Sequence, residues 1–165
     1  MDIEEDIWSP KYGLKGKLDA TVQTVILESP TSRFAKPPAL VSGPKPLEIK
    51  TGRVIAGAAI EHRAQTMLYT LMTEERYGAE VESGLLWYTQ SEEVIRVPVV
   101  RNEIRGLIMA RNQMAAWIVR RQDIGKGDAD EPFLPPTIDD ERVCKRCYAL
   151  DTCMLYRKVF CLFIK

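Results

Sequence analysis

The stretch PLEIKTGR, residues 46–53, decides how this sequence is interpreted. Its alternation of apolar and charged residues predicts a short β-strand over residues 46–51, because successive side chains of a strand point to opposite faces. Leu47 and Ile49 therefore face one side, and Glu48 and Lys50 face the other. An acidic and a basic group thus stand next to each other, just before a glycine at position 52 that permits a close turn.

The segment GLKGKLDATV, residues 13–22, carries the same alternation upstream. We expect a strand that begins at Leu14 and a further strand at residues 22–28. Asp19 lies on the face of the first strand that is opposite its apolar side chains. If this strand and the strand at 46–51 are neighbours in a sheet, the carboxylate of Asp19 converges with the Glu-x-Lys pair.

Two carboxylates and a lysine on one face suit the hydrolysis of a phosphodiester. Mg²⁺ binds through one or two carboxylates and keeps several waters, and a divalent metal activates water and neutralises charge on phosphate. We therefore expect Asp19 and Glu48 to bind Mg²⁺, or Mn²⁺ in its place. Lys50 stands beside two carboxylates and should stay protonated, so it would orient the attacking water. The basic residues that we expect to contact DNA phosphates are Lys15, Lys17, Arg53 and Arg63.

The rest of the chain alternates between helix and strand patterns. Prolines and serines predict a loop over residues 29–45, and apolar residues at three- and four-residue steps predict a helix over 54–76. Strands at 84–89 and 94–100 and a helix at 102–122 follow. This order predicts an α/β fold with a central mixed sheet flanked by helices. The expected divisions of the chain are a core at 1–122, a linker at 123–140 and a cysteine segment at 141–165.

Composition narrows the class of protein. The chain has 165 residues, of which 45% are hydrophobic, and its 23 basic and 23 acidic residues give a formal net charge of zero. A nucleic-acid partner would therefore need a local basic patch. No stretch is long and apolar enough to predict a membrane span, and the acidic start MDIEED is unlike a targeting signal. We expect no membrane partner.

All four cysteines lie in the last quarter of the chain. The spacing Cys144-x₂-Cys147-x₅-Cys153 is typical of thiolates that share a metal ion or an iron–sulfur cluster. Zinc and iron–sulfur both fit this spacing. A fourth ligand would be Cys161 or a residue outside the chain, although Cys161 also fits a buried free cysteine in an apolar helix.

The motifs occur together in an order that resembles a known family. GLKGKLDATV is followed by PLEIKTGR, then by Gln65-x-x-x-Tyr69 within IEHRAQTMLYTL, and later by GLLWY and RNQMA. This order resembles the RecB-like branch of the PD-(D/E)XK nucleases, and more closely the nuclease domain of the eukaryotic DNA replication helicase/nucleases, over residues 4–157. The resemblance implies a restriction-endonuclease-like core in residues 1–122 that lacks the family's N-terminal helix.

The resemblance also implies a role for each motif residue. Asp19 and Glu48 are implied as metal ligands, and the main-chain carbonyl of Ile49 would complete the metal site. Lys50 is implied as the catalytic lysine. The further active-site residues that it implies, four apart and so neighbours on one helix face, are Gln65 and Tyr69.

The function that the resemblance implies is that of an endonuclease. It would cut single-stranded or 5′-flap DNA in replication and repair, including Okazaki fragment processing, in the nucleus and also in the mitochondrion. The family carries a [4Fe–4S] cluster on one upstream and three downstream cysteines, and Cys144, Cys147 and Cys153 match the downstream three. No phosphate-binding loop of the form Gly-x₄-Gly-Lys-Ser/Thr occurs, so a helicase domain is expected outside this sequence. We expect a piece of a longer protein that is weakly active alone.

Two other interpretations stay open at this point. The chain could be a catalytically impaired DNA-binding or structural module, which would bind DNA without cutting it. It could also be an interaction domain stabilised by zinc or a cluster, in which the cysteines matter and the acidic residues do not. The only histidine, His62, is interpreted as a helix residue beside the site and not as a metal ligand.

Overall fold

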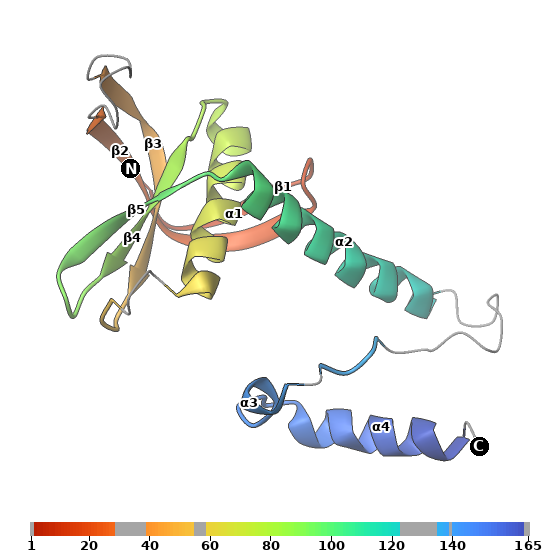
Figure 1. The fold of residues 1–165 in the computed structure, drawn as a ribbon. Helices are drawn as coiled ribbons and strands as arrows, with labels where there is room; N and C mark the ends of the chain where they lie inside the picture. Colours follow the sequence, from red (N-terminus) through yellow and green to blue (C-terminus); the bar gives the residue numbers. More distant parts are fainter. Residues whose placement is uncertain (1, 29–38, 55–58, 123–134, 139, 164–165) are drawn as a thin grey trace. The chain divides into compact units, whose positions relative to one another are not determined.

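The structure is a computed structural model that describes residues 2–28, 39–54, 59–122, 135–138 and 140–163. It separates into two compact units, residues 1–112 and 113–165, which are described one at a time. The first unit is a mixed α/β fold with an open sheet and helices beside it (Figure 1). The predicted fold class is therefore confirmed.

The sheet of the first unit has five strands in the order of the sequence. Neighbouring strands are antiparallel except β3 and β4, which run parallel and are connected through helix α1. The helix α2 (Arg101–Gln122) follows the last strand. The elements that build the sheet and its crossover are β1 (Asp2–Ser9), β2 (Leu14–Glu28), β3 (Ala39–Lys50), α1 (Ile60–Tyr77), β4 (Ser83–Tyr88) and β5 (Glu93–Pro98).

Helix α1 packs against the sheet and contributes buried side chains to both clusters of the core. Its apolar stripe places Met67, Tyr69 and Met72 in the interior. Met67 packs with side chains of β4 and β5, whereas Tyr69 and Met72 pack with side chains of β1 and β2. The helix ends at Gly78, whose φ of 62° is the left-handed conformation that glycine adopts most easily. The predicted helix at 54–76 is thus confirmed over most of its length, although the structure begins it at Ile60.

The elements in the second half of the first unit, which are β4, β5 and α2, also match the predictions. β4 and β5 form the predicted hairpin, and α2 begins one residue before the predicted start. β1 was not predicted, because its sequence DIEEDIWS is mostly polar. β1 lies at one edge of the sheet, where part of the strand faces solvent, so only some of its side chains need to be apolar.

The prediction of two separate strands at 14–28 was wrong, and so was the part of the predicted loop that covers residues 39–45. β2 is one continuous strand, and β3 begins at Ala39 and pairs with β2 from its first residue. Residues 29–38 lie outside the described part of the chain. The prolines of β3 misled the prediction. Pro44 and Pro46 pair with β2, but β4 joins β3 only from Leu47 onward, so this part of β3 has a free edge where a missing N–H does no harm.

The regular alternation of β2 is interrupted at Asp19. Leu18 and Ala20 are buried as predicted, but Thr21 is buried as well, and its hydroxyl donates to Glu5. The ladder between β1 and β2 skips Asp19, and the ladder between β2 and β3 ends at Ala20. Glu4, the expected partner of Asp19 on β1, has a φ of 52°. Asp19 is therefore set apart from the regular sheet.

The second unit contains two helices after the end of α2. They are α3 (Glu141–Cys144) and α4 (Leu150–Phe163). The side chain of Asp140 caps α3 by accepting hydrogen bonds from the main-chain N–H groups of Arg142 and Val143. The predicted linker at 123–140 lies mostly outside the described residues. Within the residues described, no helix combines the length and the apolar character needed to span a membrane.

Candidate active site

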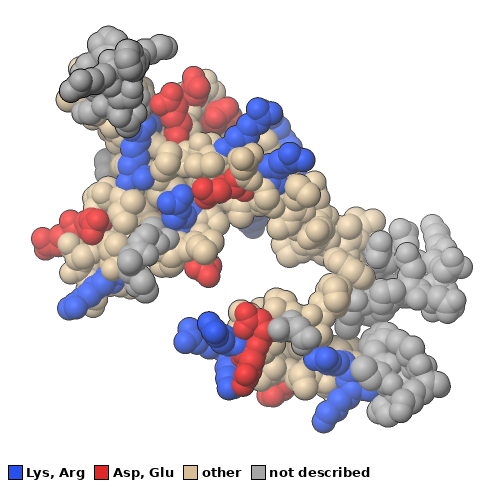
Figure 2. Space-filling view, viewed as in Figure 1, with Lys and Arg blue, Asp and Glu red and all other residues tan. Residues whose placement is uncertain are grey.

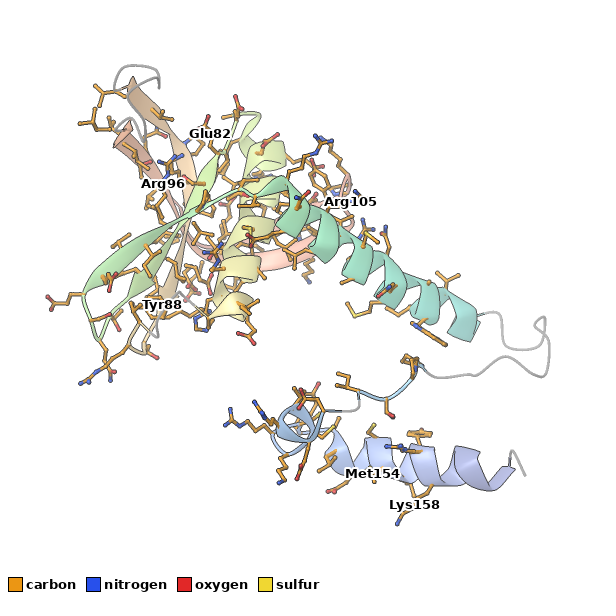
Figure 3. All side chains as sticks on the ribbon, in the orientation of Figure 1. Glu82, Tyr88, Arg96, Arg105, Met154 and Lys158 are labelled. Carbon is orange, nitrogen blue, oxygen red and sulfur yellow. The ribbon has the colours of Figure 1, made fainter. Side chains whose placement is uncertain are left out.

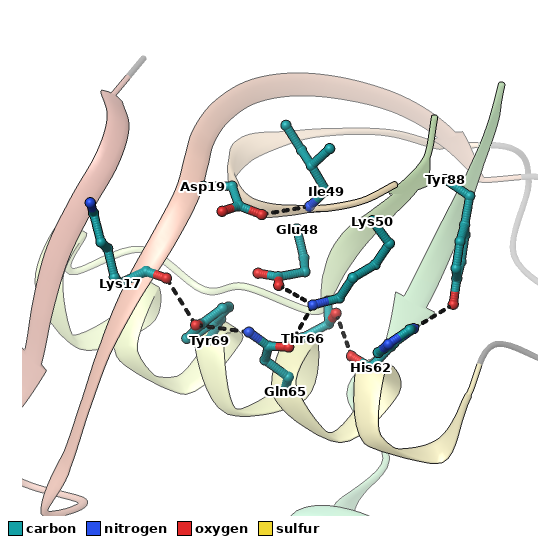
Figure 4. A network of polar contacts seen from close by, with 10 residues as sticks. All are labelled: Lys17, Asp19, Glu48, Ile49, Lys50, His62, Gln65, Thr66, Tyr69 and Tyr88. Atoms are coloured by element: carbon teal, nitrogen blue, oxygen red, sulfur yellow. Dashed lines mark hydrogen bonds and ion pairs between the residues drawn. The ribbon is translucent and has the colours of Figure 1, made fainter. Parts of the chain in front are cut away.

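Lys50 is the last residue of β3, and its side chain points toward α1 (Figure 4). Its Nζ lies 2.6 Å from Oε1 of Glu48 and 3.0 Å from Oε1 of Gln65, and it donates a hydrogen bond to each. The two acceptors come from the same strand and from the facing helix. The position of the ammonium group is therefore fixed from two directions.

Glu48 is buried, with 4% of its surface exposed. Its Oε1 accepts from Lys50, but its Oε2 is buried and has no hydrogen-bond partner among the described residues. Burial raises the pKa of Glu48, the hydrogen bond from Lys50 opposes this, and the nearby charge of Asp19 raises it further. The site thus holds a carboxylate whose negative charge is only partly compensated.

Asp19 reaches the same place from β2. Its Oδ2 accepts a hydrogen bond from the main-chain N–H of Ile49 at 2.7 Å. This bond takes the place of a ladder bond at the point where the pairing of β2 with β3 stops, so the interruption in the sheet turns the Asp19 carboxylate toward Glu48 (Figure 4). Lys15 and Lys17 are exposed, and the pKa of Lys17 is raised mainly by its hydrogen bond to Glu4, with the charge of Asp19 adding to the shift.

Gln65 and Tyr69 continue the network along α1. The Nε2 of Gln65 donates to the hydroxyl of Tyr69 at 3.1 Å, and this hydroxyl donates to the main-chain carbonyl of Lys17 at 2.9 Å. The predicted contact between neighbours on one helix face is therefore present. Gly16 makes room for the ring, because a Cβ at that position would lie 2.7 Å from Cε1 of Tyr69.

Tyr88 is a member of this network that the sequence did not single out. It is 2% exposed, and its hydroxyl lies 2.9 Å from Nδ1 of His62. In Figure 3 Tyr88 lies beside the start of α1. The available signal was weak, because Tyr88 shares the parity of Leu86 and has the pattern of an ordinary buried strand residue.

The residues that converge here fit a divalent metal ion. Among the described residues no three His, Cys, Asp or Glu side chains gather closely enough to hold a metal by themselves. Asp19 and Glu48 nevertheless supply two carboxylates, and the chain between them offers the carbonyl of Ile49. The buried Oε2 of Glu48, which has no partner, is the atom that a cation would satisfy. Mg²⁺ prefers such oxygen ligands and completes its shell with water.

The basic residues predicted to contact DNA lie at several places on the first unit. Lys15 lies 4.4 Å above the ring of Trp8, and Lys17 is ion-paired with Glu4 at 2.8 Å. Arg63 is 3.4 Å from Glu103, and Arg53 is exposed. Figure 2 shows basic and acidic side chains interspersed on the visible face of the molecule. The structure does not gather these four residues into one basic patch.

The cysteines lie in the second unit, at the turn between α3 and α4. Cys147 donates its main-chain N–H to the carbonyl of Cys144, and Cys153 stands in the first turn of α4. Cys147 and Cys153 are exposed, and Cys144 is partly exposed. The side chain of Cys161 lies outside the described residues. The described thiols are not gathered around one point.

Comparison with known proteins finds sequence similarity to DNA replication helicase/nucleases. The sequence model of the family described as DNA replication factor Dna2 matches residues 1–24, which include Asp19. The DNA replication ATP-dependent helicase/nuclease JHS1 of Arabidopsis thaliana is 40% identical over 159 residues. The corresponding helicase/nucleases dna2 of Schizosaccharomyces pombe and DNA2 of Homo sapiens are 36% and 38% identical over 159 and 160 residues.

These alignments cover 96% of this chain but only 10%, 11% and 14% of the proteins from S. pombe, A. thaliana and H. sapiens. The chain therefore spans about a tenth to a seventh of the length of the curated relatives that it matches. The similarity runs through β1 to α4, so both units have counterparts in these proteins. Along nearly its whole length, the chain is similar to one segment of the DNA replication ATP-dependent helicase/nucleases.

Proposed function

We propose that this chain is the metal-dependent nuclease segment of a DNA replication helicase/nuclease, and that it cuts single-stranded or flap DNA in the nucleus. The observation that carries the proposal is the buried Glu48 carboxylate. It bonds to Lys50, feels the charge of Asp19, and has one oxygen with no hydrogen-bond partner in the described part of the chain. A cation is the simplest group that removes this imbalance. The sequence holds no phosphate-binding loop, so the nuclease part of the relatives' named activities is the part that fits.

Each residue of the site has a task in this proposal. Asp19, Glu48 and the carbonyl of Ile49 hold Mg²⁺ or Mn²⁺, which when bound polarises the phosphate and lowers the pKa of water. Lys50 orients the attacking water by donating a hydrogen bond to it. Because its ammonium group has three N–H donors and two are engaged, one remains for water or phosphate.

Gln65 and Tyr69 act as positioning residues. The amide of Gln65 joins Lys50 to Tyr69, and Tyr69 joins this pair to the main chain of β2. Hydrogen bonds through the helix therefore connect β2, which carries Asp19, to Lys50 on β3. The lysine and the carboxylates keep a fixed geometry, which is what a reaction that depends on orientation requires.

The proposal is tested with a 5′-flap DNA and a single-stranded DNA in the presence of Mg²⁺. Asp19→Ala and Lys50→Ala should each lower cleavage by at least roughly 100-fold, whereas Lys158→Ala, an exposed lysine on α4, serves as the matched control. Calorimetric titration with Mn²⁺ gives a second readout, and Asp19→Ala should weaken binding while Lys50→Ala should not. Binding of DNA without any cleavage by the parent, or cleavage that survives both substitutions, would refute the proposed function.

We also propose that Cys144, Cys147 and Cys153 bind a [4Fe–4S] cluster, with zinc as the competing assignment. The supporting observations are their spacing and the free, at least partly exposed state of the three thiols in the second unit. Three thiolates leave one position for a further ligand. Metal analysis and the visible spectrum of anaerobically purified protein distinguish the two, because an iron–sulfur cluster absorbs visible light and Zn²⁺ does not. Protein that contains neither metal would contradict this proposal.

A further inference from the structure

His62 belongs to the same stripe of α1 as the glutamine and the tyrosine of the network. His62, Gln65 and Tyr69 are spaced by three and four residues, so their side chains lie in one row along the helix. Each of the three contacts a different strand. Tyr69 bonds to the main chain of β2, Gln65 to Lys50 on β3, and His62 to Tyr88 on β4.

The contact of His62 lies at the end of the parallel ladder. Lys50 and Tyr88 are register partners and form the last rung between β3 and β4. Both are also the terminal residues of their strands, and the N–H of Thr89 donates to the carbonyl of Lys50 at 2.9 Å. Terminal rungs open more readily than inner ones. Since Lys50 stands on this rung, opening there would move its ammonium group.

We propose that His62 is a positioning residue for Lys50, which acts by holding Tyr88 and thereby closing the last rung between β3 and β4. This inference rests on the proposed nuclease function, because Lys50 is the residue whose position matters. The geometry is specific: Nδ1 of His62 faces the Tyr88 hydroxyl at 2.9 Å, and the two ring centroids are 5.8 Å apart. Tyr88 is buried and His62 is partly exposed, so the histidine bridges the core and the open side of the site.

A different role for His62 would use its other ring nitrogen. Among the described residues, Nε2 has no recorded hydrogen bond, so it could touch a substrate phosphate directly. Two substitutions of His62 distinguish a role of Nδ1 in holding Tyr88 from a role of Nε2 in contacting phosphate. Asparagine places its amide where Nδ1 stands, and glutamine places its amide where Nε2 stands, so each preserves one ring position and removes the other.

The experiment compares cleavage of flap DNA by the parent, Lys50→Ala, His62→Ala, His62→Asn, His62→Gln and Tyr88→Phe. His62→Ala and Tyr88→Phe should each lower kcat by roughly 10-fold or more with KM nearly unchanged, and the double variant should be no worse than the worse single one. His62→Asn should recover most of the loss, and His62→Gln should not. Glu61→Gln, on the exposed side of the first turn of α1, is the matched control.

A second readout does not depend on activity. The chain has one histidine, so its ring nitrogen signals in an NMR spectrum need no assignment. Tyr88→Phe should shift the Nδ1 signal and leave the fold intact. An unchanged signal, recovery by glutamine in place of asparagine, or a kcat of His62→Ala within about twofold of the parent would each overturn the inference. If the parent and Lys50→Ala cut equally, the nuclease function itself fails, whatever the NMR result.

Discussion

Replacing Glu48 by glutamine should stabilise the metal-free protein and remove its response to Mg²⁺. Glu48 carries a buried carboxylate whose Oε2 has no partner among the described residues. A glutamine can direct its carbonyl to the Nζ of Lys50, which lies 2.6 Å from Oε1 of Glu48, and its N–H groups to Asp19. The substitution thus exchanges a repulsion between two carboxylates for a hydrogen bond.

The size of the effect follows from two opposing terms. A buried acceptor without a partner costs about 1–3 kcal/mol, and the weakened ion pair with Lys50 costs up to about 1 kcal/mol. The direction of the pKa shift decides which term wins. Because the pKa of Glu48 is raised in spite of Lys50, burial outweighs the ion pair. The free energy of unfolding should therefore rise by about 1–2 kcal/mol, or roughly 4–8 °C in Tm for a unit of this size.

The effect of pH has a defined sign. A carboxyl whose pKa is raised on folding binds its proton more tightly in the folded state. The metal-free parent should therefore lose stability as pH rises from the ordinary Glu value of 4.5 through the raised pKa of Glu48. Glu48→Gln lacks this loss. The variant should be more stable than the parent at neutral pH, and the difference should shrink as pH falls from the raised pKa toward 4.5.

The measurement is urea unfolding at neutral pH, with EDTA and then with Mg²⁺. At a Mg²⁺ concentration of roughly 100 Kd the parent gains about 2.7 kcal/mol, so the order of stabilities should reverse. Glu93→Gln, an exposed glutamate on β5, controls for the change in net charge. A variant that is no more stable than the parent in EDTA, or a parent that does not respond to Mg²⁺, would refute the reasoning.

Three further predictions concern the surroundings of the carboxylates. Gly16→Ala brings a Cβ to 2.7 Å from Tyr69, so it should lower the free energy of unfolding by about 1–3 kcal/mol and the cleavage rate by more than 10-fold. Gly43→Ala has open space around it and should change neither quantity. Urea unfolding and a cleavage assay measure the two effects. Tyr69→Phe removes a hydroxyl with two hydrogen bonds and should cost about 1–2 kcal/mol; unchanged stability and kcat would show that the network is dispensable. Asp19→Asn keeps an acceptor for the N–H of Ile49, so its Tm in EDTA should stay within about 2 °C of the parent while Mn²⁺ affinity in calorimetry falls at least roughly 10-fold.

The core of the candidate site could be predicted because its geometry is local. Glu48 and Lys50 share a face through strand parity alone, and Gln65 and Tyr69 share a face through helix spacing alone. The prediction that Asp19 lies near Glu48 needed one further assumption, that their two strands are neighbours. The pairing of β2 with β3 confirms this assumption. The hydrogen bonds that join these groups require only that α1 lies over the sheet, which is how a connection between parallel strands is built.

The rest depended on pairing between segments that the sequence does not reveal. The strand character of residues 39–45 comes from β2, whereas the local pattern with Pro44 favours a loop. The interruption at Asp19 arises where the pairings with β1 and with β3 both lapse, so no rule of alternation within β2 could find it. Tyr88 was not predicted for a similar reason. A tyrosine in a largely apolar strand has the pattern of a core residue, and its contact with His62 becomes visible only in the folded structure.

The motif residues of α1 are best understood as connections between strands. Tyr69 is bonded to β2, Gln65 to β3 and His62 to β4, so one helix face is connected to three strands of the sheet. The carboxylates and the lysine come from two of these strands, at the place where the ladder between β2 and β3 stops. A site at the end of a ladder leaves room for a metal ion and a phosphate, but it loses the rigidity of continuous pairing. The row of polar residues on α1 restores that rigidity, which is why residues that bind no metal belong to the same motif as those proposed to do so.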